Sequence, residues 1–163
     1  MIIRRAKQED KEALWLIQTQ AIRQQGISHY SSEQIEAWAG GLTPEESHSR
    51  AMEGFSQSIE HETVFVAENT DNTLVGFAML HAQSGKVGAV YVLLNYARRG
   101  IGRQLFEALE EEARHLDVAT LHVKASLNAV AFYERVGFKF EHEEPHRFRT
   151  GIEIPCAVMI KVL

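Results

Sequence analysis

The chain has 163 residues, and its 17 Lys and Arg against 22 Asp and Glu give a formal net charge of −5. One hydrophobic core is sufficient for a chain of this length, so we expect a single domain over residues 1–163. The acidic balance argues against a protein that binds nucleic acid, because such proteins normally carry an excess of basic residues. No run of about 18 or more apolar residues is present, which argues against a membrane-spanning protein.

The cysteine content favours a reducing compartment. Cys156 is the only cysteine, so an internal disulfide is excluded, and one cysteine does not make a zinc site alone. Met1 is followed directly by a β-type run rather than by the basic and apolar regions of a secretory signal. We therefore expect a cytoplasmic protein without a bound metal.

The first part of the chain predicts one strand and three helices. Residues 2–6 form a short β-type run. Apolar residues then recur at helical spacing up to Gly26, which predicts an amphipathic helix. Ser31 and Thr43 are typical N-caps of two further helices, and Pro44 follows Thr43 at the first helical position.

From residue 63 the pattern changes to strands. Residues 63–68 and 73–81 are β-type runs separated by a polar turn, which predicts a hairpin. Residues 87–94 are almost wholly apolar, which favours a strand covered on both faces. The strongest amphipathic helix of the chain is predicted over residues 100–116.

The last part of the chain alternates short elements. We expect a strand over residues 120–124, a helix over 128–136 and two antiparallel strands over 139–143 and 152–162. No repeat, low-complexity tract or flexible linker interrupts this order. The elements together predict a mixed α/β (α+β) fold.

Charge is distributed unevenly along the chain. The 35 residues between Asp71 and Glu107 contain no carboxylate, whereas average spacing would place about five there. Buried strands alone would explain part of this gap. The same window also contains four basic residues, three of them close together: Lys86, Arg98, Arg99 and Arg103.

The segment from Val90 to Arg103 runs from a strand through a glycine-containing turn into the strong helix. Backbone N–H groups at a helix start are unpaired, and the helix dipole adds positive potential. Gly100 and Gly102 would let an anion approach the main chain closely, and the neighbouring arginines would add charge-assisted hydrogen bonds. The sequence therefore predicts a phosphate-binding turn.

Two nucleotide-specific versions of such a turn do not match. A dinucleotide-binding turn requires a third small residue where Leu105 stands, and an acidic residue where the next strand ends in Lys124-Ala125-Ser126. A nucleoside triphosphatase loop requires Lys followed by Ser or Thr, but Gly102 is followed by Arg103 and Gln104. An anion site without a nucleotide signature remains.

At this point the chain strongly resembles the GNAT N-acyltransferase superfamily. Residues 97–102, Ala-Arg-Arg-Gly-Ile-Gly, resemble the family's pyrophosphate turn Gln/Arg-x-x-Gly-x-Gly/Ala, with Ala97 departing at the first position. Residues 128–138 resemble the family's Asn-x-x-Ala-x-x-Phe-Tyr-x-x-x-Gly-Phe pattern in compacted form. The resemblance implies a mostly antiparallel sheet of about six to seven strands, flanked by helices, whose central parallel pair splays apart.

The resemblance also implies an N-acetyltransferase that moves the acetyl group of acetyl-CoA to a primary amine of a small molecule or peptide. The backbone of the splayed strand would pair with pantetheine, and the N–H of Val92 would polarise the acetyl carbonyl. Asn128 would bind the pantetheine arm, and Tyr133 would be the general acid for the leaving thiolate. The expected coenzyme contacts are Tyr91, Val92, Leu94, Arg98, Arg99, Gly100, Ile101, Gly102, Arg103, Asn128 and Tyr133.

The general base and the acceptor pocket have weaker signals. Residues 84–94 contain no carboxylate, so a water chain, His81 or Tyr91, or a residue of the first helices would take the amine proton. His29 and Tyr30 fall in a loop that in this superfamily usually walls the acceptor pocket. Trp38 would be an aromatic wall of that pocket or a core residue. The expected acceptor contacts are thus His29, Tyr30, Trp38 and His81.

Two other functions remain open at this stage. Ala97 and the missing strand carboxylate are compatible with a non-catalytic acyl-CoA-binding or regulatory module on the same fold. An open sheet edge could also pair with a partner or form a homodimer.

Overall fold

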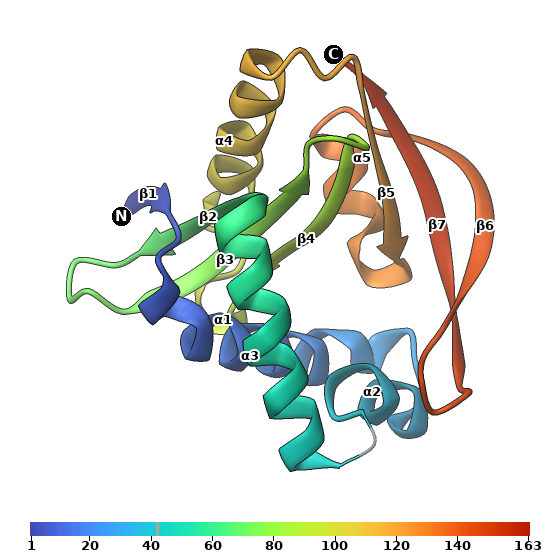
Figure 1. Cartoon of the computed structure of the whole chain (residues 1–163). Coiled ribbons are helices and arrows are strands. Elements are labelled where there is room, and N and C mark those ends of the chain that lie inside the picture. The colour runs from blue at the N-terminus through green and yellow to red at the C-terminus, as the bar shows by residue number, and fades with distance from the viewer. Residues whose placement is uncertain (42) are drawn as a thin grey trace.

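Within the part of the chain that the structure describes, seven strands form one mixed sheet between two layers of helices (Figure 1). The computed structural model describes residues 1–41 and 43–163. The strand order is β1-β2-β3-β4-β5-β7-β6, and only β4 and β5 run parallel within it. The strands are β1 (Ile2–Arg5), β2 (Thr63–Glu68), β3 (Leu74–His81), β4 (Lys86–Val92), β5 (Thr120–Ser126), β6 (Lys139–Arg147) and β7 (Glu153–Val162). The predicted fold class is confirmed.

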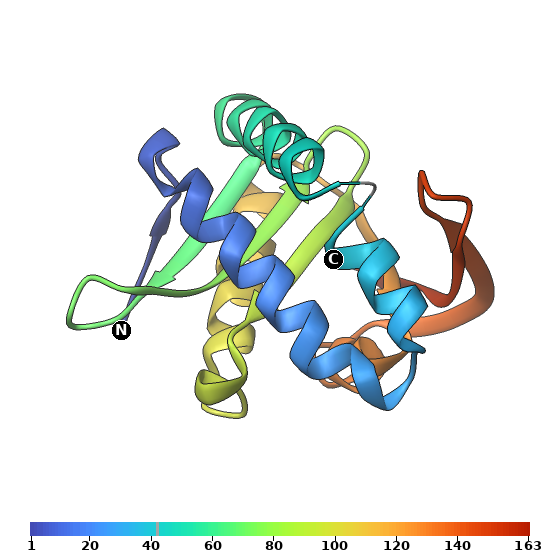
Figure 2. The same ribbon diagram turned by 90° about the horizontal axis from the view of Figure 1, so that it is seen from below.

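The helices cover opposite faces of the sheet. The view from below shows α1 lying across the strands with α3 beside it, and α4 and α5 behind the sheet (Figure 2). The helices are α1 (Lys11–Gln25), α2 (Ser32–Ala39), α3 (Pro44–His61), α4 (Ile101–His115) and α5 (Val130–Arg135). Over the residues that the structure describes, no helix combines the length and apolar character needed to cross a membrane.

Each helical layer has its own buried cluster. Leu105 and Leu109 of α4 are fully buried and pack with Leu121 of β5. Leu14 of α1 and Phe55 of α3 pack on the other face. Because these apolar residues recur at helical spacing, the sequence places the helices correctly.

Helix starts follow the predicted caps. The Ser31 hydroxyl accepts a hydrogen bond from the Gln34 N–H at 3.2 Å, and the Thr43 hydroxyl accepts one from Glu46 N–H at 3.1 Å. Both satisfy an N–H group that has no partner within its helix. The predicted starts of α2 and α3 are therefore confirmed.

The last elements differ from prediction in length. β6 continues to Arg147, four residues beyond its predicted end, and β5 continues to Ser126. Both strands pair with β7 along these extra residues. Hydrogen bonds to β7 therefore extend β6, although its charged sequence does not predict a strand there. The predicted helix over 128–136 is a short 3-10 turn followed by α5.

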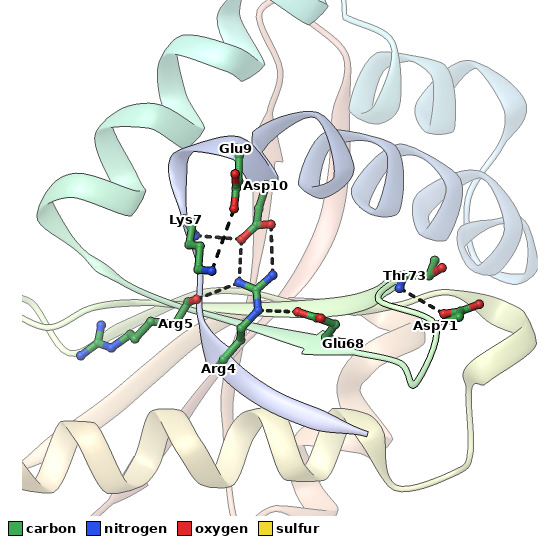
Figure 3. A network of polar contacts seen from close by, with 8 residues as sticks. All are labelled: Arg4, Arg5, Lys7, Glu9, Asp10, Glu68, Asp71 and Thr73. Atoms are coloured by element: carbon green, nitrogen blue, oxygen red, sulfur yellow. Dashed lines mark hydrogen bonds and ion pairs between the residues drawn. The ribbon is translucent and has the colours of Figure 1, made fainter.

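Ion pairs connect β1 to the residues before α1 and to β2. Figure 3 shows the Arg4 guanidinium between the carboxylates of Asp10 and Glu68, with a distance of 2.9 Å from Nη1 to Asp10 Oδ2. The buried Asp10 carboxylate also accepts the backbone N–H of Lys7 at 2.8 Å. Burial alone would raise the pKa of Asp10, but these hydrogen bonds outweigh it and lower the pKa.

Candidate active site

The sheet opens between its two parallel strands. β4 and β5 pair only at Lys86 with His122 and at Val87 with Val123. The opening begins at Gly88, where the register of β4 against β3 shifts. Since a bulge adds a residue to one strand and bends it, this bulge directs β4 away from β5. The predicted splay of the central parallel pair is confirmed.

The opening corrects one sequence prediction. β4 was expected over residues 87–94 with both faces covered, but it ends at Val92, and its last four residues are only half-buried. A cavity of about 680 Å³ takes the place of covering side chains there. The apolar composition of this strand reflects a cavity wall as well as a core.

The open edge of β4 presents backbone hydrogen-bonding groups. Leu93 N–H donates to Val75 C=O at 2.9 Å, so residues 91 and 93 face β3. Alternation along an antiparallel strand then turns the N–H and C=O of Val90 and Val92 toward the opening. The Val92 carbonyl is occupied by the side chain of Gln25, whose Nε2 donates to it at 2.7 Å. The Val92 N–H thus faces the opening.

The turn after β4 leads directly into α4 and has the geometry of an anion cradle. Arg98 and Gly100 both have left-handed backbone conformations, with φ of 62° and 81°. Gly100 caps the 15-residue α4, whose first N–H groups point out of the helix. A Cβ at Gly102 would lie 3.2 Å from the Phe132 ring and 3.7 Å from Val92 Cγ2. The missing side chain therefore keeps the approach to this backbone open.

The cavity is walled by both helical layers as well as by β4 and β5. Its polar wall contains basic side chains from α4, α5, β5 and the turn, and no Asp, Glu or His is among its described lining residues. Positive potential therefore dominates the cavity. The lining residues used below are Gln25, Trp38, Tyr91, Val92, Arg98, Gly100, Gly102, Arg103, Lys124, Ser126, Asn128, Tyr133 and Arg135.

Asn128 lines this cavity and has an unpaired polar atom. Its side-chain oxygen Oδ1 is buried and has no hydrogen-bond partner among the residues that the structure describes. An unpaired buried carbonyl costs about 1–3 kcal/mol, so native proteins seldom keep one without a function. A rotation of the Asn128 side chain toward the cavity would let a ligand N–H satisfy this oxygen.

Two tyrosines meet at the cavity from opposite sides. Tyr133 of α5 is buried, and burial raises the pKa of its hydroxyl, with a further contribution from the nearby Tyr91. Burial also raises the pKa of Tyr91, while the Trp38 side chain partly offsets this by hydrogen bonding to it. Both phenols therefore keep their protons at neutral pH.

Three of the predicted acceptor residues lie outside the cavity lining. His29 is exposed and bonds to Ser28 Oγ at 2.8 Å. The Tyr30 hydroxyl donates to Pro155 C=O at 2.7 Å and accepts from Leu127 N–H at 2.8 Å, and burial raises its pKa to about 12. Tyr30 therefore joins the α1–α2 connection to the sheet.

His81 lies behind the bulge rather than in the cavity. Its Nδ1 lies 3.3 Å from Glu62 Oε1, and its Nε2 lies 2.8 Å from where a Cβ on Gly88 would stand. The ring of His81 thus packs on the glycine that opens the sheet. Among the four predicted acceptor contacts, Trp38 lines the cavity.

Three predicted coenzyme contacts are also not among the lining side chains. Leu94 is exposed beyond the end of β4, and Arg99 lies over the ring of Tyr96 at 5.4 Å from its centroid. The side chain of Ile101 is buried in the core under α4. At Ile101, only the backbone is available to an anion in the turn.

Sequence reasoning missed four polar lining residues: Gln25, Lys124, Ser126 and Arg135. A signal for Gln25 was present, because on helix α1 it lies three and four positions beyond the buried Ile22 and Ala21. The sequence signal for Lys124 and Ser126 is weaker: they alternate with the buried Val123 and Ala125, so they lie together on the opposite face of β5. That these two side chains line the same cavity as β4 follows only from the tertiary structure.

These features define a cavity for an elongated ligand that carries anionic groups.

The family model of the acetyltransferase (GNAT) domain matches residues 26–155 of this chain. The chain therefore belongs to the GNAT acetyltransferase family. A curated Bacillus subtilis (strain 168) protein, provisionally named as an acetyltransferase, is 27% identical over 75 residues, which are 45% of this chain and 51% of that relative. The match thus spans about half the length of the curated relative.

Solved structures cover nearly the whole chain. A GCN5-related N-acetyltransferase from Rhodopseudomonas palustris has a TM-score of 0.85 and 27% identity, covering 99% of this chain and 95% of its own. The ribosomal-protein-alanine N-acetyltransferase from Brucella melitensis has a TM-score of 0.68 and 25% identity over both full chains. The PaiA N-acetyltransferase from Thermoplasma acidophilum, solved with coenzyme A, has a TM-score of 0.77 and 23% identity, covering 99% and 98%.

The residues of this chain fit such a coenzyme. The turn before α4 has the open backbone that a pyrophosphate requires, and Arg98 and Arg103 line the cavity beside it. The unpaired Asn128 Oδ1 and the free edge of β4 are suited to the amides of a pantetheine arm. Within residues 1–41 and 43–163, no group of three or more His, Cys, Asp or Glu side chains is placed to hold a metal ion.

Proposed function

We propose that residues 1–163 act as one N-acetyltransferase domain that transfers the acetyl group of acetyl-CoA to a primary amine. The observation that carries this proposal is that the unpaired side chain of Asn128, the free edge of β4 and the anion cradle all line one cavity. Acetyl-CoA supplies an activated thioester carbonyl. The chain supplies binding, orientation and proton positions.

The two helical layers suggest where each substrate lies. Arg98, Arg103 and Asn128 line the α4–α5 side, which suits the coenzyme. Gln25 and Trp38 line the α1–α2 side, which leaves that wall for the acceptor amine. Direct attack of the amine nitrogen on the thioester carbon is then possible through the opening between β4 and β5.

The Val92 N–H would stabilise the negative charge that develops on the carbonyl oxygen. It faces the opening. The Gln25 amide, 2.7 Å from the Val92 carbonyl, holds the next peptide unit, Val92–Leu93, and so restrains the backbone of Val92. A donor held in place before the reaction pays little reorganisation energy. Gln25 is therefore proposed as a positioning residue.

Tyr133 would donate the proton that the departing thiolate takes when the carbon–sulfur bond breaks. Its buried hydroxyl stays protonated because burial raises its pKa. The same desolvation raises the pKa of a thiol formed beside it, so the pKa values of proton donor and proton acceptor rise together and the transfer is not blocked. The amine loses its own proton to water, since the described cavity lining offers no carboxylate or imidazole.

The test is amine-dependent release of free thiol from acetyl-CoA across a panel of amines. The proposal predicts release that requires both substrates. Binding of acetyl-CoA without release over the whole panel would support a non-catalytic acyl-CoA-binding module instead. Failure to bind acetyl-CoA in calorimetry would contradict both functions.

Tyr133→Phe tests the proton donor. We expect kcat to fall about 10²-fold or more, as for loss of a general acid, with little change in the Kd of acetyl-CoA. Tyr30→Phe is the matched control, because it deletes the same hydroxyl outside the cavity. The control should lower stability through its lost bonds to Pro155 and Leu127. Equal rates for Tyr133→Phe and wild type would remove Tyr133 from the mechanism.

A further inference from the structure

Two charged side chains of the cavity, Lys124 and Arg135, are not used by the chemistry above. Lys124 of β5 lines the cavity, but its neighbours Val123 and Ala125 are buried in the cluster under α4 and α5. Because side chains alternate along a strand, Lys124 points to the opposite face, where α1 and α2 lie. This is the side that the proposed function leaves for the acceptor.

Neighbouring contacts confirm this orientation. Lys124 Nζ lies 3.6 Å from Glu144 Oε2 on β6. Glu144 pairs in register with Cys156, which packs in the cluster formed by α1, α2 and β7. Ser126, two residues beyond Lys124, pairs with the same Cys156 and also lines the cavity.

The Lys124 ammonium retains hydrogen-bonding capacity for a ligand. An ammonium has three N–H donors, and the contact to Glu144 is longer than a hydrogen bond. The Glu144 side chain is 52% exposed, so water already screens this pair. An anion in the cavity would therefore bind Lys124 without losing more than the weak ion pair with Glu144.

The charges that line the cavity favour an anion on this wall, while the nearby carboxylates of β6, Glu143 and Glu144, are not part of the described lining. The basic residues Arg98, Arg103 and Arg135 line the coenzyme side, whereas Lys124 is the charged residue that the described lining places toward α1 and α2. Burial lowers the pKa of the nearby His146, and the charges of Lys124 and Lys86 lower it further, which keeps this histidine neutral at pH 7. A polycationic acceptor would meet no carboxylate in this lining.

We infer that the acceptor is an amine that also carries a carboxylate, as in an amino acid or short peptide, and that Lys124 binds this carboxylate. The inference rests on the proposed acetyl transfer and specifies its substrate class. The Ser126 hydroxyl, on the same face of β5, provides a second donor toward the same group.

The register suggests the shape of this acceptor. Val123 pairs with Val87, so Lys124 is level with Gly88, four residues before Val92. At about 3.3 Å per residue, the Val92 N–H lies about 13 Å further along β4, and the flexible lysine side chain covers part of that distance. The reacting amine and the carboxylate are therefore separated by several bonds, as they are in the ε-amine of lysine.

The experiment compares acceptors that differ only by the carboxylate. The pairs are L-lysine with cadaverine, and glycylglycine with glycylglycinamide. We expect kcat/KM to be about ten-fold or more higher for the carboxylate-bearing member, because hydrogen bonds to charged groups are among the strong ones. Lys124→Met should abolish this preference, Lys124→Arg should restore it, and Lys124→Glu should favour cadaverine.

Two controls separate specificity from folding. Lys139→Met removes an exposed lysine of β6 outside the cavity and should keep the wild-type preference. The Kd of acetyl-CoA should be unchanged in Lys124→Met, since Lys124 faces away from the coenzyme side. A preference that survives in Lys124→Met, or faster turnover of the carboxylate-free amines, would overturn this inference alone. No amine-dependent thiol release with any acceptor would overturn the proposed acetyl transfer, and this inference with it.

Discussion

Replacement of Asn128 by leucine separates a binding role from a structural one. Leucine has nearly the same shape as asparagine but neither donor nor acceptor. In the free protein the Asn128 Oδ1 is buried and unpaired, so the variant removes a polar atom that already lacks its partner. Replacing an unpaired buried polar group with an apolar one of the same shape is close to neutral or stabilising. We therefore expect the free variant to be as stable as wild type, or slightly more stable.

Coenzyme binding should respond in the opposite direction. A ligand N–H that bonds to Oδ1 gives this oxygen its missing partner, and we take about 1–1.5 kcal/mol, the upper part of the range for the net value of one hydrogen bond. Loss of that bond raises the Kd of acetyl-CoA about five- to ten-fold. The signature is weaker coenzyme binding without loss of stability.

Thermal unfolding and calorimetry measure the two quantities. For a domain of this size, 1 kcal/mol corresponds to a change in Tm of about 2–4 °C. The free variant should match or exceed the wild-type Tm, while the increase in Tm caused by acetyl-CoA should shrink with the higher Kd. A free variant that melts several degrees lower would show that Asn128 is bonded within the protein. An unchanged Kd would refute its contact with the coenzyme.

Two further variants test the anion cradle and the β1 network. Gly102→Val places a branched side chain on a Cβ that stands 3.2 Å from the Phe132 ring in the cavity wall, and we expect the Kd of acetyl-CoA to rise about ten-fold. Gly54→Val, whose Cβ meets nothing within 4 Å in α3, should leave the Kd unchanged. Equal Kd values for both variants would contradict the cradle. Asp10→Asn should lower the free energy of unfolding at pH 7 by about 2 kcal/mol, measured by urea titration. Since folding lowers the pKa of Asp10, its contribution is complete above the unfolded value of 3.8 and is lost as pH falls through the lower folded value, so the gap between variant and wild type should narrow in acid. A gap that stays constant from pH 7 to acid would contradict this assignment.

The elements most visible in the sequence were those that carry their own local signal. The helix α4 combines apolar residues at helical spacing with a glycine before its start, and it runs over Ile101–His115, within the predicted range. The hairpin of β2 and β3 is separated by a polar turn and was predicted nearly to the residue. By contrast, β6 is fully exposed, and its outer half exists because β7 provides hydrogen bonds.

The same distinction applies to the site. The motif at residues 97–102 predicts a cradle because its glycines and helix start are adjacent in the chain. His81 illustrates the opposite case, since its residue type suggests acid–base chemistry while its position behind Gly88 gives it a packing contact. Residue type alone does not tell on which side of a strand a side chain lies.

The sequence by itself determined the order of the elements, the acid-free stretch with its arginines, and the turn that would bind an anion. Each of these depends on neighbouring residues, whose spacing fixes a helix face, a cap or a cradle. Only the tertiary structure decided where β4 and β5 part, that Gln25 reaches the Val92 carbonyl, and that Lys124 lines the same cavity as Asn128 and Tyr133. These depend on strand register and on which layer a helix covers, and both are set by packing between segments far apart in the chain.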